Sequence, residues 1–415
     1  MRSGPAVRRL SDWDAERLRA LAGEYETPLY VLDLDRVREN AARLRAAFDA
    51  EEISYAAKAN TTRPVLETIE STGVGAECAS AGEVERALAA GFGGGDVRYT
   101  AVNPPDEDLD YVVQAATEHD LIVTIGAADT LDRLAERGFS GRLCIRANPG
   151  VGAGHHEKVS TGAAPKFGVP LDRVPELASE AVDRGFDLVG LHAHAGSGIS
   201  GEDLQAHREL VARMGDLART VIDEVGRLEF VNVGGGLGVP YREDESPLDL
   251  EAVAAATREA FGDVEATLGI EPGRYFVADA GVLLTRVNTV KPTPETTVVG
   301  VDAGMTTLVR PAMYDSYHAI RSLAPDAGAR ETTSATVAGP ICETADVLGE
   351  DRSLPDPERG DLLAVGNAGA YGYEMSSNYN SRPRPAVVAI DGETARPAVR
   401  RETVADITEL ETWSK

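Results

Sequence analysis

The feature that most constrains the fold is an alternation of short apolar runs with amphipathic stretches between Asp35 and about Ala280. Amphipathic stretches such as Gly82–Leu88 and Leu131–Leu134 place apolar residues at helical spacing, so the period switches from two to 3.6 and back. Repeated strand–helix units predict a parallel sheet, and eight of them in about 245 residues predict a (β/α)₈ TIM barrel. A doubly wound open sheet is the alternative. The strand-like runs are Ser54–Ala57, Gly75–Cys78, Val97–Thr100, Ile122–Ile125, Leu143–Arg146, Leu188–His194, Phe230–Gly234 and Glu271–Val277.

The two flanks of this region have a different pattern. After Gly281 the helical spacing fades, and strand-like runs separated by Gly and Pro predict a mainly β domain. The run Leu29–Leu32 is also strand-like and could belong to that domain instead of the barrel. Because one core rarely grows past about 250 to 300 residues, we expect a barrel at 36–282 and a β domain at 283–415 joined by segment 1–35. The β runs are Thr297–Val299, Ser334–Val337, Leu362–Val365 and Ala386–Ile390.

The charge balance excludes several classes of partner. The chain has 68 acidic and 41 basic side chains, a net charge of −27, so we expect no nucleic-acid partner and no anionic membrane surface. No run approaches the roughly 18 apolar residues of a membrane span, and the polar start does not resemble a signal peptide, which predicts a cytoplasmic protein. The cationic residues are almost all arginine, and with the acidic excess this predicts a halophilic protein whose self-repulsion is screened by salt. Three cysteines are too few, and odd in number, for a disulfide framework.

Polar residues follow the predicted strands. Catalytic groups of a (β/α)₈ barrel lie at the C-terminal ends of its strands, so these residues are the candidates for chemistry. We expect them to meet at one end of the barrel. The strings at the ends of the runs are Lys58-Ala59-Asn60, Arg146-Ala147-Asn148, His192 to Ser197 and Gly234-Gly235-Gly236, and the last run includes Glu271-Pro272-Gly273-Arg274.

Three of these strings have two interpretations each. Lys58 closes an apolar strand, where burial would lower its pKa and provide the neutral amine of Schiff-base chemistry, although a lysine at a strand end can also simply extend to solvent. Gly234–Gly236 would let backbone N–H groups approach a phosphate, but glycine clusters also mark ordinary turns. Glu271 and Arg274 flank a Pro-Gly turn and could equally form a surface ion pair.

The two histidines of the next string lie two residues apart. His192 and His194 therefore face the same side of a strand, as a metal pair would. No acidic or cysteine ligand set with metal-like spacing accompanies them, so we predict no metal site. Packing of one imidazole face against an aromatic cofactor fits the pair better.

The β region adds three further candidates. Gly339–Glu343 joins a thiol, Cys342, to a carboxylate after a rigid turn, although Cys342 could instead be a small buried residue. Arg310–Tyr314 offers a clamp for a carboxylate, and Ala368–Gly372 presents a tyrosine among small residues.

Taken together and in this order, these strings resemble the diaminopimelate decarboxylases. That family of pyridoxal-phosphate enzymes has an alanine-racemase-like barrel and is grouped with the ornithine and arginine decarboxylases. The similarity extends from about Thr27 to Pro385 and includes the tail Ser377–Pro385. The strings that carry it are Tyr55–Asn60, His192–Ser197, Gly234–Gly238, Glu271–Arg274, Arg310–Tyr314, Gly339–Asp346 and Ala368–Gly372.

The resemblance implies a set of residues that bind the cofactor, pyridoxal 5'-phosphate. Lys58 would hold it as a Schiff base, His194 would stack on its pyridine ring, and Glu271 would accept a hydrogen bond from the ring nitrogen. The residues implied around the phosphate are Ser197, Gly236, Gly273, Arg274 and Tyr371.

The resemblance also implies the substrate and the reaction. The enzyme would decarboxylate meso-2,6-diaminopimelate to L-lysine and CO₂, the last step of lysine biosynthesis. Cys342 would donate a proton and Glu343 would meet the distal amine. In this family the Cys-Glu loop reaches the neighbouring subunit's barrel, which implies a homodimer with shared active sites. The residues implied at the distal carboxylate and its surroundings are Arg274, Arg310, Tyr314 and Tyr371.

Three alternatives remain open. An amino-acid racemase on the same barrel would use a second acid–base residue, but the Cys-Glu pair and the additional arginine argue against it. A non-catalytic cofactor carrier would not need the carboxylate clamp. Decarboxylases of ornithine, arginine or carboxynorspermidine form the third alternative; ornithine lacks the distal carboxylate and would leave buried polar groups unsatisfied in such a site.

Overall fold

The computed structural model describes residues 6–151, 153–154, 166–194, 196–197 and 204–412. The chain forms two compact units. The β unit consists of Met1–Val37, Val239–Pro247 and Val277–Lys415, and the barrel unit consists of Arg38–Gly238 and Leu248–Phe276. No helix in the described residues is long and apolar enough to cross a membrane.

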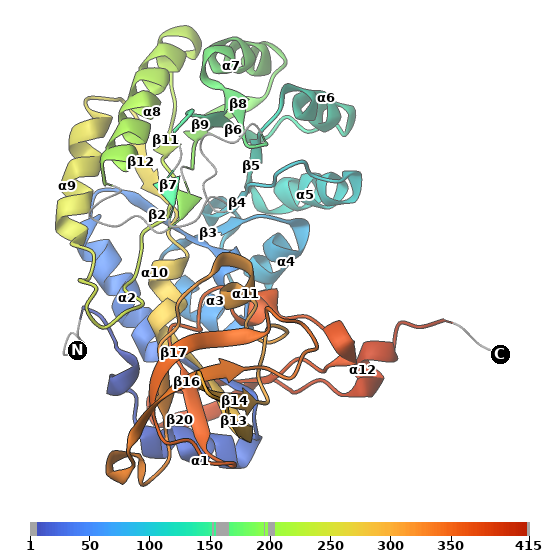
Figure 1. The fold of residues 1–415 in the computed structure, drawn as a ribbon. Helices are drawn as coiled ribbons and strands as arrows, with labels where there is room; N and C mark the ends of the chain where they lie inside the picture. The colour runs from blue at the N-terminus through green and yellow to red at the C-terminus, as the bar shows by residue number, and fades with distance from the viewer. Residues whose placement is uncertain (1–5, 152, 155–165, 195, 198–203, 413–415) are drawn as a thin grey trace. The chain divides into compact units, whose positions relative to one another are not determined.

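In the barrel unit, eight parallel strands close on themselves, which confirms the predicted fold. Their order is β2-β3-β4-β5-β6-β9-β11-β12, and β12 pairs with β2 to complete the ring. The flanking helices lie outside the strands (Figure 1). The strands are β2 (Glu52–Ala56), β3 (Gly75–Cys78), β4 (Val97–Tyr99), β5 (Ile122–Ile125), β6 (Arg142–Asn148), β9 (Asp187–His192), β11 (Phe230–Asn232) and β12 (Thr267–Ile270).

Helices connect successive strands, as the amphipathic pattern predicts. Some begin at a capping side chain: Ser80 caps α4 through the backbone N–H of Glu83, and Asp249 caps α9. Short strands β7 (Ala153–Gly154), β8 (Val169–Pro170) and β10 (Gly196–Ser197) lie in the connections. The helices are α2 (Leu34–Ala47), α3 (Arg63–Glu70), α4 (Ala81–Ala89), α5 (Asp106–His119), α6 (Ala128–Glu136), α7 (Val174–Asp183), α8 (Leu204–Val225), α9 (Leu250–Phe261) and α10 (Arg274–Val277).

The barrel interior is filled by side chains. Phe230 of β11 lies opposite Gly190 of β9, and a Cβ at Gly190 would collide with the phenyl ring. The guanidinium of Arg98 lies 4.2 Å from the centroid of the same ring and donates to Ser54 Oγ at 2.9 Å. Arg98 also forms an ion pair with Glu52. Since Glu52 begins β2, this charged pair belongs to the N-terminal end of the barrel, the end associated with stability.

One predicted strand is wrong. The eighth run was expected at Glu271–Val277, but the strand is Thr267–Ile270, and Arg274–Val277 forms the short helix α10. Pro272 lacks an N–H for the strand ladder, so pairing stops before it. Glu271 consequently follows the strand directly, at its C-terminal end.

In the β unit, the long strand β13 (Gly281–Pro292) is the central element. It pairs with β1, β14 and β18, within the order β17-β16-β14-β13-β1-β19-β20. Strand β1 (Leu29–Asp33) is antiparallel to β13 and parallel to β19, so the N-terminal run belongs to this sheet. The other elements are β14 (Thr297–Val301), β15 (Ile320–Ser322), β16 (Thr332–Ala338), β17 (Val347–Pro355), β18 (Leu362–Val365), β19 (Ala386–Asp391), β20 (Thr394–Val399), α1 (Ala15–Tyr25), α11 (Arg310–Tyr314) and α12 (Val404–Thr408).

Candidate active site

Lys58 lies in a single helical turn, Ala57–Ala59, directly after β2. The hydroxyl of Tyr55 donates to the carbonyl of Asn60 at 2.9 Å and fixes this turn. Lys58 Nζ is 2.7 Å from Glu77 Oε2 on the adjacent strand β3. The lysine side chain is 39% exposed and the glutamate only 2% exposed, so the amine can be reached from solvent while its partner is buried.

Glu271, the first residue after β12, forms a buried pair with His192. The distance between His192 Nε2 and Glu271 Oε1 is 3.0 Å, and each side chain is 3% exposed. Burial alone raises the pKa of Glu271, but the charge and hydrogen bond of His192, together with Lys58, outweigh burial and lower this pKa below its usual value. Because an ionised carboxylate only accepts hydrogen bonds, His192 Nε2 carries the hydrogen.

The second oxygen of Glu271 fits a pyridoxal ring. Glu271 Oε2 is buried and has no hydrogen-bond partner in the part of the chain that the structure describes. A buried charged acceptor without a donor is costly, and a protonated pyridine nitrogen would supply the donor. Nearby, His194 Nδ1 accepts a hydrogen bond from the Gly235 N–H at 3.2 Å. Burial lowers the pKa of His194 to about 3, so its ring is neutral and suited to pack on an aromatic face.

The glycine turn after β11 forms a narrow backbone cradle. Gly234 and Gly236 have φ of 84° and 87°, a region that favours glycine. A Cβ at Gly234 would lie 2.6 Å from His194 Nδ1, and one at Gly235 would collide with the carbonyl oxygen of Glu271. Backbone N–H groups can therefore approach a phosphate here without obstruction.

Of the remaining candidate cofactor residues in the barrel unit, the structure describes the surroundings of some but not of others. A Cβ at Gly273 would lie 3.0 Å from the Ala56 carbonyl oxygen, so the turn before the buried Arg274 packs against the end of β2. Ser197 is part of β10, but its side chain lies outside the described residues.

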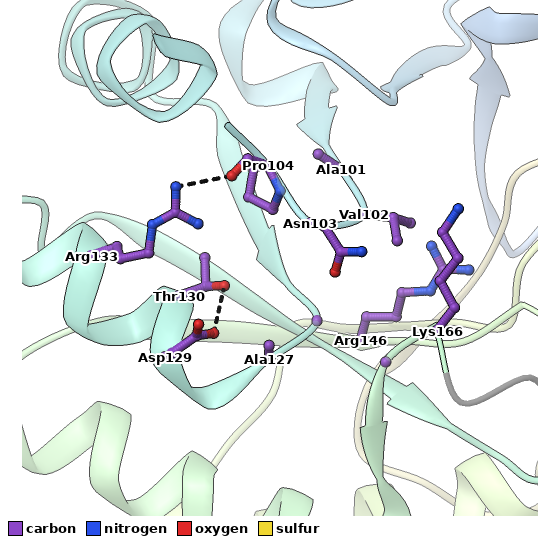
Figure 2. A pocket seen from close by; sticks show the side chains of 12 residues that line it. Ala101, Val102, Asn103, Pro104, Ala127, Asp129, Thr130, Arg133, Arg146 and Lys166 are labelled. Carbon is purple, nitrogen blue, oxygen red and sulfur yellow. Dashed lines mark hydrogen bonds between the residues drawn. The ribbon is translucent and has the colours of Figure 1, made fainter. Parts of the chain in front are cut away.

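A cationic pocket lies at the C-terminal ends of β4, β5 and β6 (Figure 2). Its volume is about 160 Å³, and its lining includes Arg133, Arg146 and Lys166. Arg146 is buried, and its guanidinium has neither a hydrogen bond nor an ion pair among the described residues, although it lies 5.2 Å from the Phe167 ring centroid. Burial lowers the pKa of Arg146, while Glu271 and Glu77 raise it. Sequence reasoning noted Arg146 at a strand end but gave it no role.

In the β unit, Arg310 lies with two tyrosines. Its guanidinium is 5.7 Å from the ring centroid of Tyr314 and 5.8 Å from that of Tyr371. Arg310 is 3% exposed and donates to Ser316 Oγ at 3.1 Å. Such a guanidinium, framed by aromatic rings, can bind a carboxylate in a defined direction.

Cys342 and Glu343 lie exposed on the loop between β16 and β17. Asp346 closes this loop, because its carboxylate accepts the Ile341 N–H at 2.6 Å and its carbonyl accepts the Gly339 N–H at 2.8 Å. Cys78 and Cys144 are buried, whereas Cys342 is not, so the alternative of a buried structural cysteine is wrong for Cys342.

Sequence reasoning missed Glu77 and the pairing of His192 with Glu271. The signal for Glu77 was available, because a carboxylate inside the apolar run Gly75–Cys78 requires a partner. The pairing of His192 had no local signal, since the two residues are 79 positions apart.

Residues 34–278 match the family model described as the pyridoxal binding domain of pyridoxal-dependent decarboxylases. Diaminopimelate decarboxylase of Methanothermobacter thermautotrophicus is 42% identical over 93% of this chain and 92% of that protein. The Escherichia coli K12 enzyme of the same name is 37% identical over 97% of each chain. A crystal structure of the Helicobacter pylori diaminopimelate decarboxylase complexed with L-lysine matches with a TM-score of 0.88 at 32% identity, covering 95% of this chain and 99% of that one. The chain described here belongs to the diaminopimelate decarboxylase family of pyridoxal-dependent decarboxylases.

Proposed function

We propose that this protein is a pyridoxal-phosphate-dependent decarboxylase that converts meso-2,6-diaminopimelate to L-lysine and CO₂, the last step of lysine biosynthesis. The observation that carries this proposal is the buried carboxylate of Glu271, which keeps one oxygen without a partner in the described chain. The names of the relatives support the choice of substrate, as do solved relatives complexed with L-lysine.

Different residues hold and orient the pyridine ring of the cofactor. Lys58 attaches the cofactor, and the neutral ring of His194 covers one face of it. Glu271 stays ionised and holds a proton on the ring nitrogen, while His192 fixes the direction of Glu271. When bound, pyridoxal phosphate supplies the electron sink that makes loss of CO₂ possible. The residues proposed for the phosphate are Ser197, Gly236, Gly273, Arg274 and Tyr371.

Glu77 assists Lys58 in this proposal. When the amine of Lys58 is not bound to the cofactor, it needs a partner at the end of the barrel strands. Glu77 Oε2 lies 2.7 Å from Nζ and is held in position by burial. The pair therefore keeps Lys58 close to the reacting atoms instead of letting it extend into solvent.

The residues of the β unit select the substrate and complete the reaction. Arg274, Arg310 and Tyr314 bind the distal carboxylate, and Glu343 binds the distal amine. Tyr371 also contacts the substrate. Ornithine lacks that carboxylate, and a site built to bind a polar group discriminates against an analogue without it more strongly than against a missing methylene. Cys342 donates the proton that replaces CO₂ on the α-carbon.

We also propose a cytoplasmic homodimer with shared active sites in a halophilic cell. Cys342 and Glu343 are exposed at a loop tip, which is explained if the tip serves the barrel of a second copy. The three free cysteines suit a reducing compartment. The net charge of −27 supports the halophilic assignment.

The test is CO₂ release by the purified protein at high salt. We expect release from meso-diaminopimelate, with L-lysine as the other product, and little release from ornithine or arginine. Preferential release from ornithine or arginine would overturn the substrate assignment. Racemisation of an amino acid without CO₂ release would overturn the reaction itself.

A further inference from the structure

A strained turn in the β unit contacts the loop that carries Cys342 and Glu343. Within residues 378–382, the consecutive residues Asn380 and Ser381 have φ of 57° and 52°. Left-handed backbone is unfavourable for residues other than glycine, and asparagine tolerates it better than most. Two such residues in succession require that the surrounding structure hold them.

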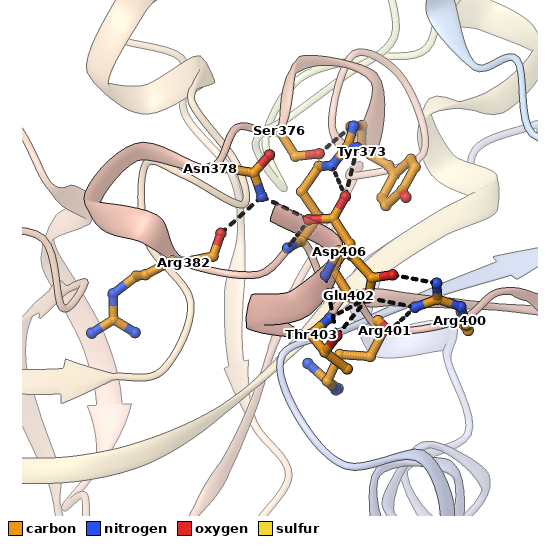
Figure 3. A network of polar contacts seen from close by, with 10 residues as sticks. Tyr373, Ser376, Asn378, Arg382, Arg400, Arg401, Glu402, Thr403 and Asp406 are labelled. Carbon is orange, nitrogen blue, oxygen red and sulfur yellow. Dashed lines mark hydrogen bonds and ion pairs between the residues drawn. The ribbon is translucent and has the colours of Figure 1, made fainter. Parts of the chain in front are cut away.

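Glu402 supplies that support (Figure 3). Its carboxylate accepts hydrogen bonds from Asn378 Nδ2 at 2.6 Å, from the Arg384 N–H at 2.8 Å and from Arg384 Nε at 2.6 Å. Asn378 Nδ2 also donates to the carbonyl of Arg382 at 3.0 Å. Both ends of the turn are therefore fixed by the same carboxylate.

The turn uses two side chains to contact the Cys-Glu loop. The hydroxyl of Tyr379 donates a hydrogen bond to Glu343 Oε1, and Asn380 Nδ2 donates to Cys342 Sγ at 3.3 Å. The bond to Glu343 raises the pKa of Tyr379, so the hydroxyl remains a donor. All four side chains are exposed, and water could satisfy each of them, so a need for hydrogen bonds alone does not explain the strained backbone.

The chemistry of the two contacts matches what a proton donor and an amine ligand require. An N–H donor stabilises a thiolate more than a thiol, because the thiolate is the stronger acceptor. When Cys342 gives up its proton, Asn380 stabilises the thiolate that remains. Tyr379 donates to Glu343 Oε1, and the second carboxylate oxygen can accept a hydrogen bond from an ammonium group.

We propose that Tyr379 and Asn380 are positioning residues: Asn380 holds Cys342 through its sulfur and stabilises the thiolate left after proton donation, and Tyr379 orients Glu343 toward the distal amine. The inference rests on the proposed function for the roles of Cys342 and Glu343. The acidity of the thiol can nevertheless be measured without any turnover.

The first test measures the pH dependence of Cys342 alkylation in the holoenzyme. Iodoacetamide reacts with thiolates, and Cys78 and Cys144 are buried, so peptide mass spectrometry follows Cys342 alone. Asn380→Asp keeps the shape and the tolerance for left-handed backbone but replaces the donor with a carboxylate. We expect the midpoint of the profile to rise by about one pH unit, which slows alkylation about tenfold at neutral pH.

Two further variants keep this test decisive. Asn380→Gly removes the donor and suits the left-handed backbone, so it should fold and raise the midpoint by about half a pH unit. Ser377→Asp introduces the same charge in an exposed position near the turn and should leave the midpoint unchanged. The titratable neighbours Glu343 and Tyr379 are unaltered in all three variants. An unchanged midpoint in both Asn380 variants would overturn the proposal for Asn380.

The second test addresses Tyr379. In Tyr379→Phe we expect the KM for meso-diaminopimelate to rise about tenfold, while kcat and the alkylation profile stay near wild type. A fall in kcat at unchanged KM would overturn the role of Tyr379. If the wild-type protein releases no CO₂ from meso-diaminopimelate, the proposed function fails, but the alkylation profiles still decide the role of Asn380.

Discussion

Replacing Glu271 with glutamine removes a charge and almost nothing else. In the wild type, His192 Nε2 lies 3.0 Å from Glu271 Oε1, and the amide oxygen of glutamine can keep this contact. The amide cannot, however, offer an anionic oxygen to the ring nitrogen of pyridoxal phosphate. A hydrogen bond to a charged group contributes about 1.5–3 kcal/mol, so the Kd for pyridoxal phosphate should rise about 10- to 150-fold. Loss of a preorganised charge that stabilises the reaction should reduce kcat about 10²–10³-fold.

The assay is an absorbance titration of the apoprotein with pyridoxal phosphate, followed by CO₂ release at saturating cofactor. The matched control is Glu52→Gln, since Glu52 pairs with Arg98 at the opposite end of the same barrel and should not affect the Kd. The pKa of Glu271 in the folded protein is lowered, so its carboxylate stays charged near neutral pH and becomes protonated only in strong acid. The differences in Kd and kcat between Glu271→Gln and wild type should therefore not depend on pH near neutrality. A glutamine variant with wild-type Kd and kcat would refute this reasoning.

Other predictions test the dimer, the composition and the core. Mixing inactive Lys58→Ala and Cys342→Ala subunits should restore about a quarter of wild-type activity, since half of the randomly formed dimers carry one intact shared site. No recovery of activity would exclude active sites shared between subunits. The melting temperature should rise steeply with KCl, and a melt insensitive to salt would contradict the halophilic assignment. Burial lowers the pKa of His207 to about 4. Acidification from about pH 7 to about pH 5 should therefore lower the free energy of unfolding by about 2 kcal/mol, because the unfolded chain binds a proton that the folded chain does not. The His207→Gln variant should lack this pH dependence in urea melts. Gly190→Ala should destabilise the protein by about 1–3 kcal/mol in the same melts, because the new methyl group collides with Phe230, and unchanged stability would show that the ring can move aside.

Much of the barrel could be predicted because each strand and helix has its own local pattern. The failure at Glu271–Val277 shows the limit of that information. Tyr275, Phe276 and Val277 are residue types typical of strands, yet they form α10, where the ring of Phe276 packs edge-on against Tyr55 with 5.3 Å between centroids. Tertiary packing overrides intrinsic β propensity in such cases.

The place of the N-terminal strand could be stated only as an alternative. Leu29–Asp33 has the alternation of any half-buried strand, and its partners are β13 and β19, which lie about 250 and 350 residues further along the chain. Nothing in a local window specifies a pairing at that separation. The buried cluster that includes Val31, Val282 and Val388 is therefore visible only in the folded chain.

For the site, sequence position identified the groups but not their partners. Lys58 was found because it follows an apolar run, and Glu271 because it stands beside a Pro-Gly turn and an arginine. The contact of Asn380 with Cys342 joins residues 38 positions apart and had no local signal. The ion pair of Glu77, by contrast, could have been predicted from the sequence. A charge inside a short apolar run must be paired, because burial of an isolated charge costs more than folding can supply. In a parallel sheet its partner is expected at the end of a neighbouring strand, and Glu77 lies opposite Ala56, two residues before Lys58.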